Sequence, residues 1–415
     1  MPELFSSAEL AMLETLEYRD SEVLQLSASL RDQGLEPDRV SAVLTQAKLR
    51  RDATAKWGPE ASTSLFTRTG LEQATRRGVA DRHALRFANA GIDTVADLGC
   101  GLGADSAALL RAGVAVVSVD IDPHTATAAR HNLSAFPLSE VREADVMSLD
   151  PSHLKTSDGR PVQGLWLDPA RRETSGGTTS RLFDPEAFSP PFSAITAWAE
   201  RGMPMGVKMG PGMDHAAIPD NAEAEWVSCG GDVVELVLWF NALARPGVRK
   251  AATILSSDPL SPTVLASLES DEDFDAADTQ PIGPTAQYLY EPDGAAIRAG
   301  LVNQLVAATR GHLLDPRIAY VTSDHRVDVP WATGWEIEEV LPMKVKQLKK
   351  WVRERGITRL TIKKRGVDIV PESLRSQLLA GIKKSARGES ATLVLTRWDS
   401  PDGERRAVFS VRRIE

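Results

Sequence analysis

The feature that most constrains the fold is a glycine-rich loop that follows a short apolar run. Residues 95–98 read Val-Ala-Asp-Leu, and Gly99, Gly101 and Gly103 then alternate with other residues before a helical stretch begins near Ala104. Glycine is needed where the backbone turns sharply and approaches a ligand closely, because a Cβ atom would block both. A helix that starts at such a loop points free backbone N–H groups at the ligand. The pattern predicts a buried strand, a nucleotide-binding loop and a helix.

Two cofactors are compatible with the glycines alone. Gly99, Gly101 and Ala104 satisfy the dinucleotide pattern G-x-G-x-x-G/A, and Asp120 lies at about the spacing of its ribose-binding acid. Asp97 separates the alternatives, because a carboxylate just before the glycines repels a pyrophosphate but attracts an ammonium group. S-adenosylmethionine carries that ammonium and a dinucleotide does not, so Asp97 favours S-adenosylmethionine.

Three further carboxylates follow predicted strands. The apolar run at 114–120 ends at Asp120, the shorter run at 141–145 ends at Asp145, and residues 164–167 precede Asp168. Ligands of open α/β sheets bind at the carboxyl ends of the strands. We expect Asp120 to accept from the ribose hydroxyls, Asp145 to lie near the adenine amine, and Asp168 to lie on the same rim.

These residues resemble motif I and the ribose acid of the class I S-adenosylmethionine-dependent methyltransferases. The resemblance implies that the cofactor contacts Asp97, Gly99, Cys100, Gly101, Gly103, Asp105, Asp120, Ile121 and Asp145. Asp168-Pro169-Ala170-Arg171 stands where the family has an Asp-Pro-Pro-aromatic motif beside the methyl acceptor. The second proline and the aromatic residue of that motif are missing, which leaves open whether the acceptor is a base amine.

The candidate catalytic residues are Asp168, Pro169, Arg171 and Lys208. Asp168 and the Pro169 carbonyl are placed to accept hydrogens from an acceptor amine. Lys208, near the end of the predicted strand 203–209, is a candidate for holding a phosphate or base oxygen, and Arg171 is a candidate for contacting RNA phosphate. Lys208 and Arg171 each have an alternative explanation that involves no substrate. Lys208 can simply end the strand, and Arg171 can pair with nearby acids, a role that arginine fills well.

The predicted strands together indicate the fold class. Those at 95–98, 114–120, 141–145, 164–167 and 203–209 form a parallel series, and those at 233–240 and 251–255 are predicted to form a hairpin around a turn at 245–247. This predicts an α/β protein with a Rossmann-like seven-stranded methyltransferase sheet, an N-terminal helical region and a small C-terminal α+β domain.

Four regions are predicted along the chain. They are N-terminal helices at 1–75, a methyltransferase domain at 76–256, an acidic loop with a connecting region at 257–335, and a basic THUMP-like domain at 336–415. Ser6 and Glu9 match a capping box at the first helix, and Gly34 is expected to end the second. The acidic stretch 258–284 is predicted to be a solvent-exposed loop.

Charge is divided unevenly along the chain. The 415 residues carry a net charge of −9, but residues 341–415 contain 19 Lys and Arg against 8 Asp and Glu. Such an excess of cations favours a polyanionic partner. The clusters lie at 344–350, 363–365, 383–384 and 405–406. In the first, Val345, Leu348 and Val352 recur at helical spacing, which predicts a buried stripe beneath a cationic face.

The basic tail also has a predicted α+β pattern. Helices are expected at 343–355 and 371–385, and strands at 357–363, 391–398 and 406–413, with a hairpin turn at 399–403. Taken with residues 168–171, 207–214 and 288–292, this tail resembles the bacterial methyltransferases with a C-terminal THUMP-like domain, which are distantly similar to trimethylguanosine synthases. THUMP-type domains are associated with RNA binding, so the resemblance implies an RNA methyltransferase. A small-molecule methyltransferase and a non-catalytic RNA-binding protein stay open as alternatives.

Cysteine usage and hydropathy limit the remaining possibilities. Cys100 and Cys229 lie far apart without metal-type spacing, so the sequence predicts neither a disulfide framework nor a metal site. Residues 168–171 also resemble the fourth motif of uridine C5-methyltransferases, but no cysteine nucleophile follows strand 203–209, so Cys229 is predicted to be structural. No run approaches the roughly 20 apolar residues of a membrane span, and no signal peptide is evident. We therefore expect a cytoplasmic protein without membrane contact.

Overall fold

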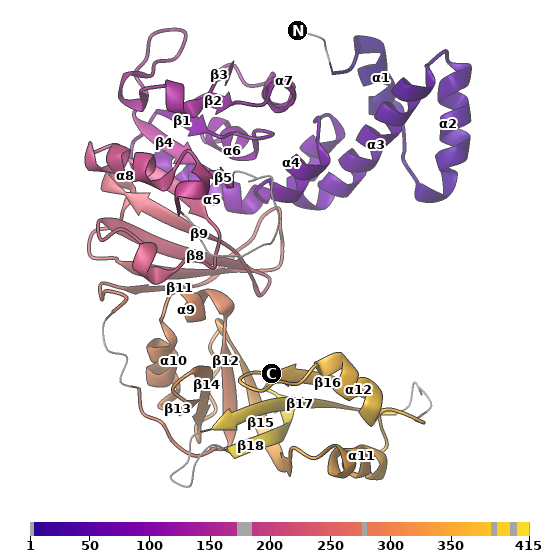
Figure 1. Cartoon of the computed structure of the whole chain (residues 1–415), viewed down its shortest axis with the longest axis vertical. Coiled ribbons are helices and arrows are strands. Elements are labelled where there is room, and N and C mark those ends of the chain that lie inside the picture. Colours follow the sequence, from indigo (N-terminus) through magenta and orange to yellow (C-terminus); the bar gives the residue numbers. More distant parts are fainter. Residues whose placement is uncertain (1–3, 172–184, 276–279, 383–387, 399–404, 415) are drawn as a thin grey trace. The chain divides into compact units, whose positions relative to one another are not determined.

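The computed structural model describes residues 4–171, 185–275, 280–382, 388–398 and 405–414. The chain forms two compact units, residues 1–249 with 255–264 and residues 250–254 with 265–415 (Figure 1). Both units combine helices with β-sheet, which confirms the predicted α/β class.

Helices dominate the first part of the first unit. They are α1 (Ser7–Thr15), α2 (Val23–Asp32), α3 (Pro37–Trp57), α4 (Arg68–Gln73) and α5 (Arg77–Asn89). The predicted capping box begins α1, because the Glu9 N–H donates to Ser6 Oγ and the Ser6 N–H donates to the Glu9 carboxylate. Gly34, with φ of +92°, follows α2 as expected. Apolar side chains of α1, α2 and α3 share a core of their own.

The predicted methyltransferase sheet is present, but among the described residues it has nine strands rather than the seven expected. Seven of them lie side by side in the order β8-β9-β7-β4-β1-β2-β3. β7, β4, β1, β2 and β3 run parallel, and β9 is antiparallel to both β7 and β8. The bounds are β1 (Thr94–Leu98), β2 (Ala115–Asp120), β3 (Ser139–Glu143), β4 (Gly164–Leu167), β7 (Met205–Met209), β8 (Ala222–Cys229) and β9 (Asp232–Phe240).

Helices and two short strands complete this unit. α6 (Ala104–Arg111) follows β1, α7 (Pro123–Asn132) follows β2, and α8 (Phe192–Glu200) precedes β7. β5 (Ala170–Arg171) pairs with β6 (Phe188–Ser189). Trp166 on β4 and Trp239 on β9 are almost fully buried with Phe87 of α5 and Leu109 of α6. This core anchors α5 and α6, which carry side chains of the site described below.

The terminal hairpin differs from the prediction. β9 pairs with β8 across a turn at Gly230 and Gly231, which have φ of +63° and +90°. The predicted hairpin of 233–240 with 251–255 is therefore wrong, although the latter segment is a strand, β10 (Lys250–Leu255). Strand β8 was not predicted, because it begins with the sequence Ala-Glu-Ala-Glu and glutamate is uncommon in strands. The acidic stretch 258–284 is also not a loop throughout, since it contains β11 (Val264–Ser270).

The second unit contains a sheet in the order β13-β14-β12-β15-β18-β17-β16. Its elements are β12 (Tyr288–Pro292), α9 (Gly294–Arg298), α10 (Val302–Thr309), β13 (His312–Asp315), β14 (Ile318–Ser323), β15 (Ala332–Pro342), α11 (Val345–Glu354), β16 (Ile357–Lys364), α12 (Pro371–Leu378), β17 (Glu389–Trp398) and β18 (Arg405–Arg413). The predicted order of helices and strands in the tail is confirmed, although α12 ends at Leu378, earlier than expected. The predicted turn at 399–403 lies outside the described residues.

None of the helices that the described residues form has both the length and the apolar character needed to cross a membrane. Within the same residues, no group of three or more His, Cys, Asp or Glu side chains is arranged to hold a metal ion.

Candidate active site

The glycine loop lies at the carboxyl end of β1 and has the predicted conformation. Gly99, Gly101 and Gly103 have φ of +92°, +55° and +86°. A Cβ atom at Gly99 would lie 3.3 Å from the backbone oxygen of Asp168, in addition to the cost of its positive φ. The N–H groups of Gly99 and Cys100 both donate to the Val119 oxygen, at 2.9 and 3.0 Å. The loop is therefore held between the ends of β2 and β4.

Asp120 is fixed by backbone donors at the end of β2. Its carboxylate accepts from the N–H of Gly101 at 3.0 Å and from the N–H of Asp122 at 2.9 Å. Burial raises the pKa of Asp120 above its ordinary value. Asp122 itself is the N-cap of α7 and accepts from Thr125 N–H at 2.7 Å. Asp120 is thus oriented beside the glycine loop.

An apolar surface lies next to Asp120. Ile121 is 65% exposed, and Met147, in the short helix after β3, is 45% exposed. The N–H of Ala144 donates to the Asp120 oxygen at 3.1 Å, which brings the segment after β3 beside the end of β2. Asp145 is exposed and accepts from the Met147 N–H at 2.9 Å. Ile121 and Asp145, both predicted to contact the cofactor, therefore follow neighbouring strands.

Asp97 lies inside the protein, one residue before the end of β1. It is 1% exposed, and Ser106 Oγ of α6 donates a hydrogen bond to its carboxylate. Burial raises the pKa of Asp97 to about 8, and the negative charge of Asp105 adds to the effect. Such a carboxyl group gains most from a nearby cation, because the cation offsets its buried charge.

The acceptor side of the candidate site contains an ion pair. Lys208 Nζ on β7 donates to Asp168 Oδ2 at 2.7 Å and to Thr75 Oγ1 at 3.1 Å. The Lys208 side chain is 14% exposed and that of Asp168 is 38% exposed. Burial disfavours the ammonium, but the carboxylates of Asp168, Asp105 and Glu235 together outweigh it and raise the pKa of Lys208 above its usual range. Lys208 therefore stays charged and acts as a hydrogen-bond donor.

Two other residues that were predicted to be catalytic, Pro169 and Arg171, follow Asp168 in the chain. Pro169 is buried directly after it. Arg171 ends strand β5, but its side chain lies outside the described part of the structure, as does the whole of Arg172. Their roles remain predictions.

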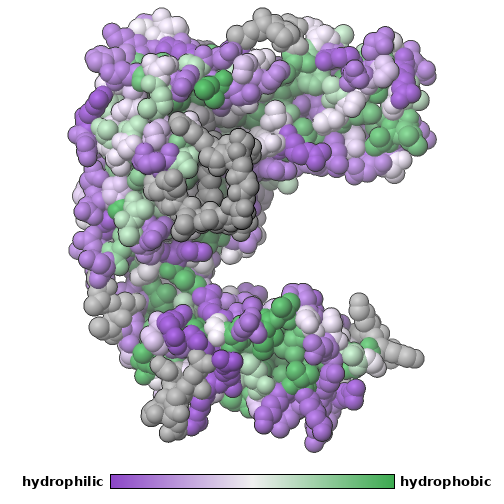
Figure 2. All heavy atoms as spheres, viewed as in Figure 1, coloured by the Kyte–Doolittle hydropathy of each residue, from purple (hydrophilic) through white to green (hydrophobic). Residues whose placement is uncertain are grey.

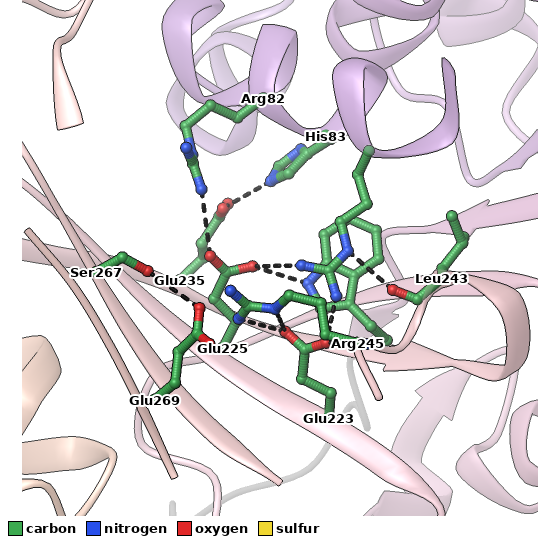
Figure 3. Close-up of polar contacts among 11 residues, drawn as sticks. Arg82, His83, Glu223, Glu225, Glu235, Leu243, Arg245, Ser267 and Glu269 are labelled. Carbon is green, nitrogen blue, oxygen red and sulfur yellow. Dashed lines mark hydrogen bonds and ion pairs between the residues drawn. The ribbon is translucent and has the colours of Figure 1, made fainter. Parts of the chain in front are cut away.

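A hydrogen-bonded chain extends from Lys208 into the core. Thr75 Oγ1 donates to Asp105 Oδ2 at 2.7 Å, and Asp105 Oδ1 lies 2.8 Å from His83 Nδ1. His83 Nε2 lies 2.7 Å from Glu235 Oε1 on β9, and Figure 3 shows the two side chains facing each other. Burial disfavours the imidazolium, but the two carboxylates outweigh it and raise the pKa of His83 to about 9. A protonated His83 donates to both acids.

Sequence reasoning missed His83, Thr75 and Glu235. The available signals were a lone histidine on the apolar face of α5 and a lone glutamate within the apolar run of β9. Neither signal identifies its partner, because the two residues are 152 positions apart in the chain.

Buried ion pairs attach α5 to the β8–β9 hairpin (Figure 3). The Glu223 carboxylate accepts from Arg86 and, at 2.6 Å, from Arg245. Glu225 pairs with Arg82 at 3.2 Å and with Arg86 at 3.6 Å. These ion pairs compensate the buried negative charges of Glu223 and Glu225, the residues because of which β8 was not predicted. They also hold α5, the helix that carries His83, against the hairpin.

Neither cysteine is in a reactive setting. Cys100 is buried in the glycine loop, and burial raises the pKa of its thiol well above the ordinary value. Cys229 is buried at the end of β8, where its Sγ donates to the Ser256 oxygen at 3.2 Å. This environment fits the structural role predicted for Cys229.

Comparisons with known proteins identify the family of this chain. A methyltransferase domain model matches residues 96–158, a THUMP domain-like model matches 332–413, and a model of a domain of unknown function matches 6–53. An uncharacterised S-adenosylmethionine-dependent methyltransferase of Mycobacterium tuberculosis is 33% identical over 349 residues, which cover 82% of this chain and 89% of the relative. The chain belongs to the S-adenosylmethionine-dependent methyltransferases.

A solved structure supports the fold of the methyltransferase over nearly its whole length. A candidate methyltransferase of Porphyromonas gingivalis W83 superposes with a TM-score of 0.70 and 20% identity, over 96% of this chain and all of that chain. The methyltransferase therefore uses S-adenosylmethionine and carries a THUMP-like domain at its C-terminus. Membership of this enzyme family decides against the non-catalytic alternative.

Proposed function

We propose that this methyltransferase transfers a methyl group to a nucleotide in RNA. The observation that carries the proposal is the cationic face of α11 in the THUMP-like domain. Lys346, Lys349, Lys350 and Arg353 lie on one side of this helix, and Leu348, Trp351 and Val352 are buried on the other. Hydrophilic residues cover the position of α11 in Figure 2. The predicted buried stripe of this helix included Val345, and this part of the prediction was wrong because Val345 is 41% exposed. Trp351 completes the buried face instead.

The other basic clusters of the tail contribute less support. Lys363 pairs with Glu291 at 2.6 Å, and Arg365 lies 3.7 Å from the same carboxylate. Their charges are therefore partly compensated inside the domain. The cluster at 383–384 lies outside the described residues. We assign the phosphate contacts to α11, because it presents Lys346, Lys350 and Arg353 as exposed cations on one face of a helix; Lys350 also lies 3.6 Å from Glu354.

The rim residues fit the cofactor chemically. Gly101 leaves room beside the backbone, since a Cβ atom there would meet nothing within 4 Å, and Asp120 is aimed by two backbone donors to accept from ribose hydroxyls. Ile121 and Met147 offer exposed apolar surface for an adenine ring, with Asp145 beside them. Asp97, with its raised pKa, suits the ammonium of the methionine part. Gly103 and Asp105 begin α6, although the carboxylate of Asp105 is already bound to Thr75 and His83.

Asp168 and Lys208 have complementary roles at the acceptor. S-adenosylmethionine, when bound, supplies a methyl group on an electrophilic sulfonium. Asp168 accepts a hydrogen bond from the methyl acceptor and thereby orients the lone pair of the acceptor atom toward the methyl group. Such orientation supplies much of the rate enhancement in a displacement reaction. Lys208 keeps Asp168 ionised and donates to an oxygen of the nucleotide. The Pro169 carbonyl and Arg171 complete the proposed acceptor contacts.

The Asp97→Ala and Asp120→Ala variants are each expected to weaken S-adenosylmethionine binding by about 10- to 100-fold. A hydrogen bond to a charged group contributes about 1.5–3 kcal/mol, and both carboxylates face positions that ligand donors would occupy. Calorimetric titration of the full chain measures the dissociation constants. Asp158→Ala, in an exposed turn with an arginine partner, is the matched control. Wild-type affinity in Asp97→Ala would remove this residue from the cofactor site.

The Lys346→Ala/Lys349→Ala/Arg353→Ala variant is expected to bind RNA more weakly and with less dependence on salt. Each lost phosphate contact lowers the slope of log affinity against log salt by about 0.7 on a single strand, so three contacts lower it by about 2. Fluorescence anisotropy with a mixed-sequence RNA oligonucleotide gives the slope. The control replaces Arg31, Lys155 and Arg201, which are exposed cations outside the THUMP-like domain. Equal slopes for both variants would contradict the assignment of α11.

The substrate class is tested directly by methyl transfer. The enzyme is incubated with labelled S-adenosylmethionine and fractionated cellular RNA, and the modified nucleoside is identified by mass analysis. Label in one RNA fraction supports the proposal and gives the methylated atom. Label found only in small molecules of an RNA-free extract would favour the small-molecule alternative.

A further inference from the structure

A cavity of about 500 Å³ lies among the N-terminal helices of the first unit. Its volume falls within the range of about 300–1,000 Å³ that is typical of ligand sites. Leu44 and Leu49 of α3 and Leu71 of α4 provide apolar surface, and the ring of Tyr18 lines the cavity as well. α3 and α4 are drawn beside each other in Figure 1. The Methyltransferase domain match begins at residue 96, so this cavity lies outside it.

Charged side chains line the same cavity. Lys48 and Arg68 are exposed, and neither forms an ion pair with another residue that the structure describes. Glu72 and Asp52 also line the cavity with exposed carboxylates, and Asp52 pairs with Arg51 at 2.7 Å. The guanidinium of Arg51 lies 5.0 Å from the centre of the Tyr18 ring. The cavity thus offers two cations, two carboxylates and an aromatic ring.

Lys56 connects two cavity-lining residues with the acceptor side of the candidate site. Lys56 Nζ of α3 donates to the backbone oxygens of Leu71 and Glu72, at 2.8 and 2.9 Å. Burial, together with the nearby charges of Lys208 and Arg76, lowers the pKa of Lys56 to about 8. Lys56 therefore lies within electrostatic range of Lys208.

The chain itself limits the distance between the two sites. Thr75, which accepts from Lys208, follows Glu72 by three residues, so their Cα atoms are separated by at most about 11 Å. At a rise of about 3.4 Å per nucleotide, this corresponds to about three stacked nucleotides at most.

We propose that this cavity binds one or two RNA nucleotides adjacent to the methylated nucleotide. This inference rests on the proposed RNA methyltransferase function and extends it to the N-terminal helices. Lys48 and Arg68 contact phosphates, Tyr18 stacks on a base, and Glu72 accepts from an exocyclic amine. RNA suits the cavity for two reasons. Its phosphates would follow a series of cations, which are Lys48, Arg68, Lys56, Arg76 and Lys208. A base of any identity can stack on the Tyr18 ring, because stacking on aromatic rings does not depend on sequence.

The test uses the full chain and a mixed-sequence RNA oligonucleotide that contains 4-thiouridine. Photo-cross-linking followed by peptide mass analysis is expected to give cross-links in residues 18–52 or 68–72, in addition to those at α11. The Lys48→Glu/Arg68→Glu variant is expected to reduce the cross-links in these two segments at least about tenfold, because two cations that contact phosphates become anions that repel them. It should also raise KM for total cellular RNA while kcat changes little.

Two comparisons make the result interpretable. Arg31→Glu/Lys155→Glu is the matched control, and an unchanged dissociation constant for S-adenosylmethionine shows that both variants are folded. Cross-links at α11 alone, or equal KM values for the two variants, would overturn the cavity proposal while the RNA methyltransferase function stands. If no RNA is cross-linked or methylated at all, the proposed function fails together with the cavity proposal.

Discussion

The Asp168→Asn variant is expected to lose about two orders of magnitude in kcat while its affinity for S-adenosylmethionine changes little. The amide keeps the size of the side chain but neither carries the charge that pairs with Lys208 at 2.7 Å nor accepts a proton. Positioned acid–base groups contribute about 10²- to 10⁴-fold to rates, which sets the size of the effect. Single-turnover methyl transfer to the labelled RNA fraction, with calorimetry for the cofactor, separates the two parameters.

Two further variants sharpen this test. Lys208→Met is expected to lower kcat as well, because Asp168 then loses the cation that stabilises its ionised form. Asp158→Asn, which changes an exposed carboxylate paired with Arg160, should leave both kcat and cofactor affinity unchanged. Full activity in Asp168→Asn would mean that the acceptor does not use this carboxylate.

The His83→Gln variant is expected to lower the free energy of unfolding by about 3–5 kcal/mol. Removing one partner of a buried ion pair leaves a buried charge uncompensated, and here Asp105 and Glu235 both lose their cation. Urea unfolding followed by circular dichroism measures the change. His124→Gln, in an exposed position of α7, is the matched control.

The contribution of His83 to stability is expected to depend on pH. Folding raises the pKa of His83 from 6.5 to about 9, because its two carboxylate neighbours outweigh its burial. The folded state therefore binds the proton more tightly than the unfolded state. The stabilising contribution is fully present below about pH 6.5 and is lost as the pH rises through about 9.

Comparison of the two proteins isolates this contribution. The stability difference between wild type and His83→Gln should shrink across that pH range. The raised pKa of Asp97 affects both proteins alike, so it cancels in the difference. A difference that stays constant from pH 6 to pH 10 would show that His83 is not charged in the folded protein.

The cofactor side of the site could be predicted from sequence because its parts are local. Gly99, Gly101 and Gly103 indicate a loop with positive φ angles, because residues other than glycine adopt such angles only with steric strain. Asp120 and Asp168 end apolar strands, and parallel strands bring their carboxyl ends to one rim. The family resemblance added Cys100 and Ile121, which spacing alone does not single out.

The buried acids could not be interpreted in the same way. In sequence, Glu223 and Glu225 argue against a strand, because a buried charge is costly unless it is paired. Their partners Arg82, Arg86 and Arg245 lie on α5 and beyond β9. The strand therefore became visible only when the tertiary contacts that compensate it were known, and its omission misplaced the hairpin.

The sequence by itself determined the nucleotide-binding loop, the positions of the parallel strands along the chain, the cofactor and the amphipathic basic helix α11. Each follows from residues that are neighbours in the chain or recur with a fixed period. Only the tertiary structure decided which charges meet: Lys208 with Asp168, His83 between Asp105 and Glu235, and Lys56 beside the N-terminal cavity. The physical reason is that ion pairs and buried hydrogen bonds form between side chains brought together by packing, and local sequence patterns carry no information about such distant partners.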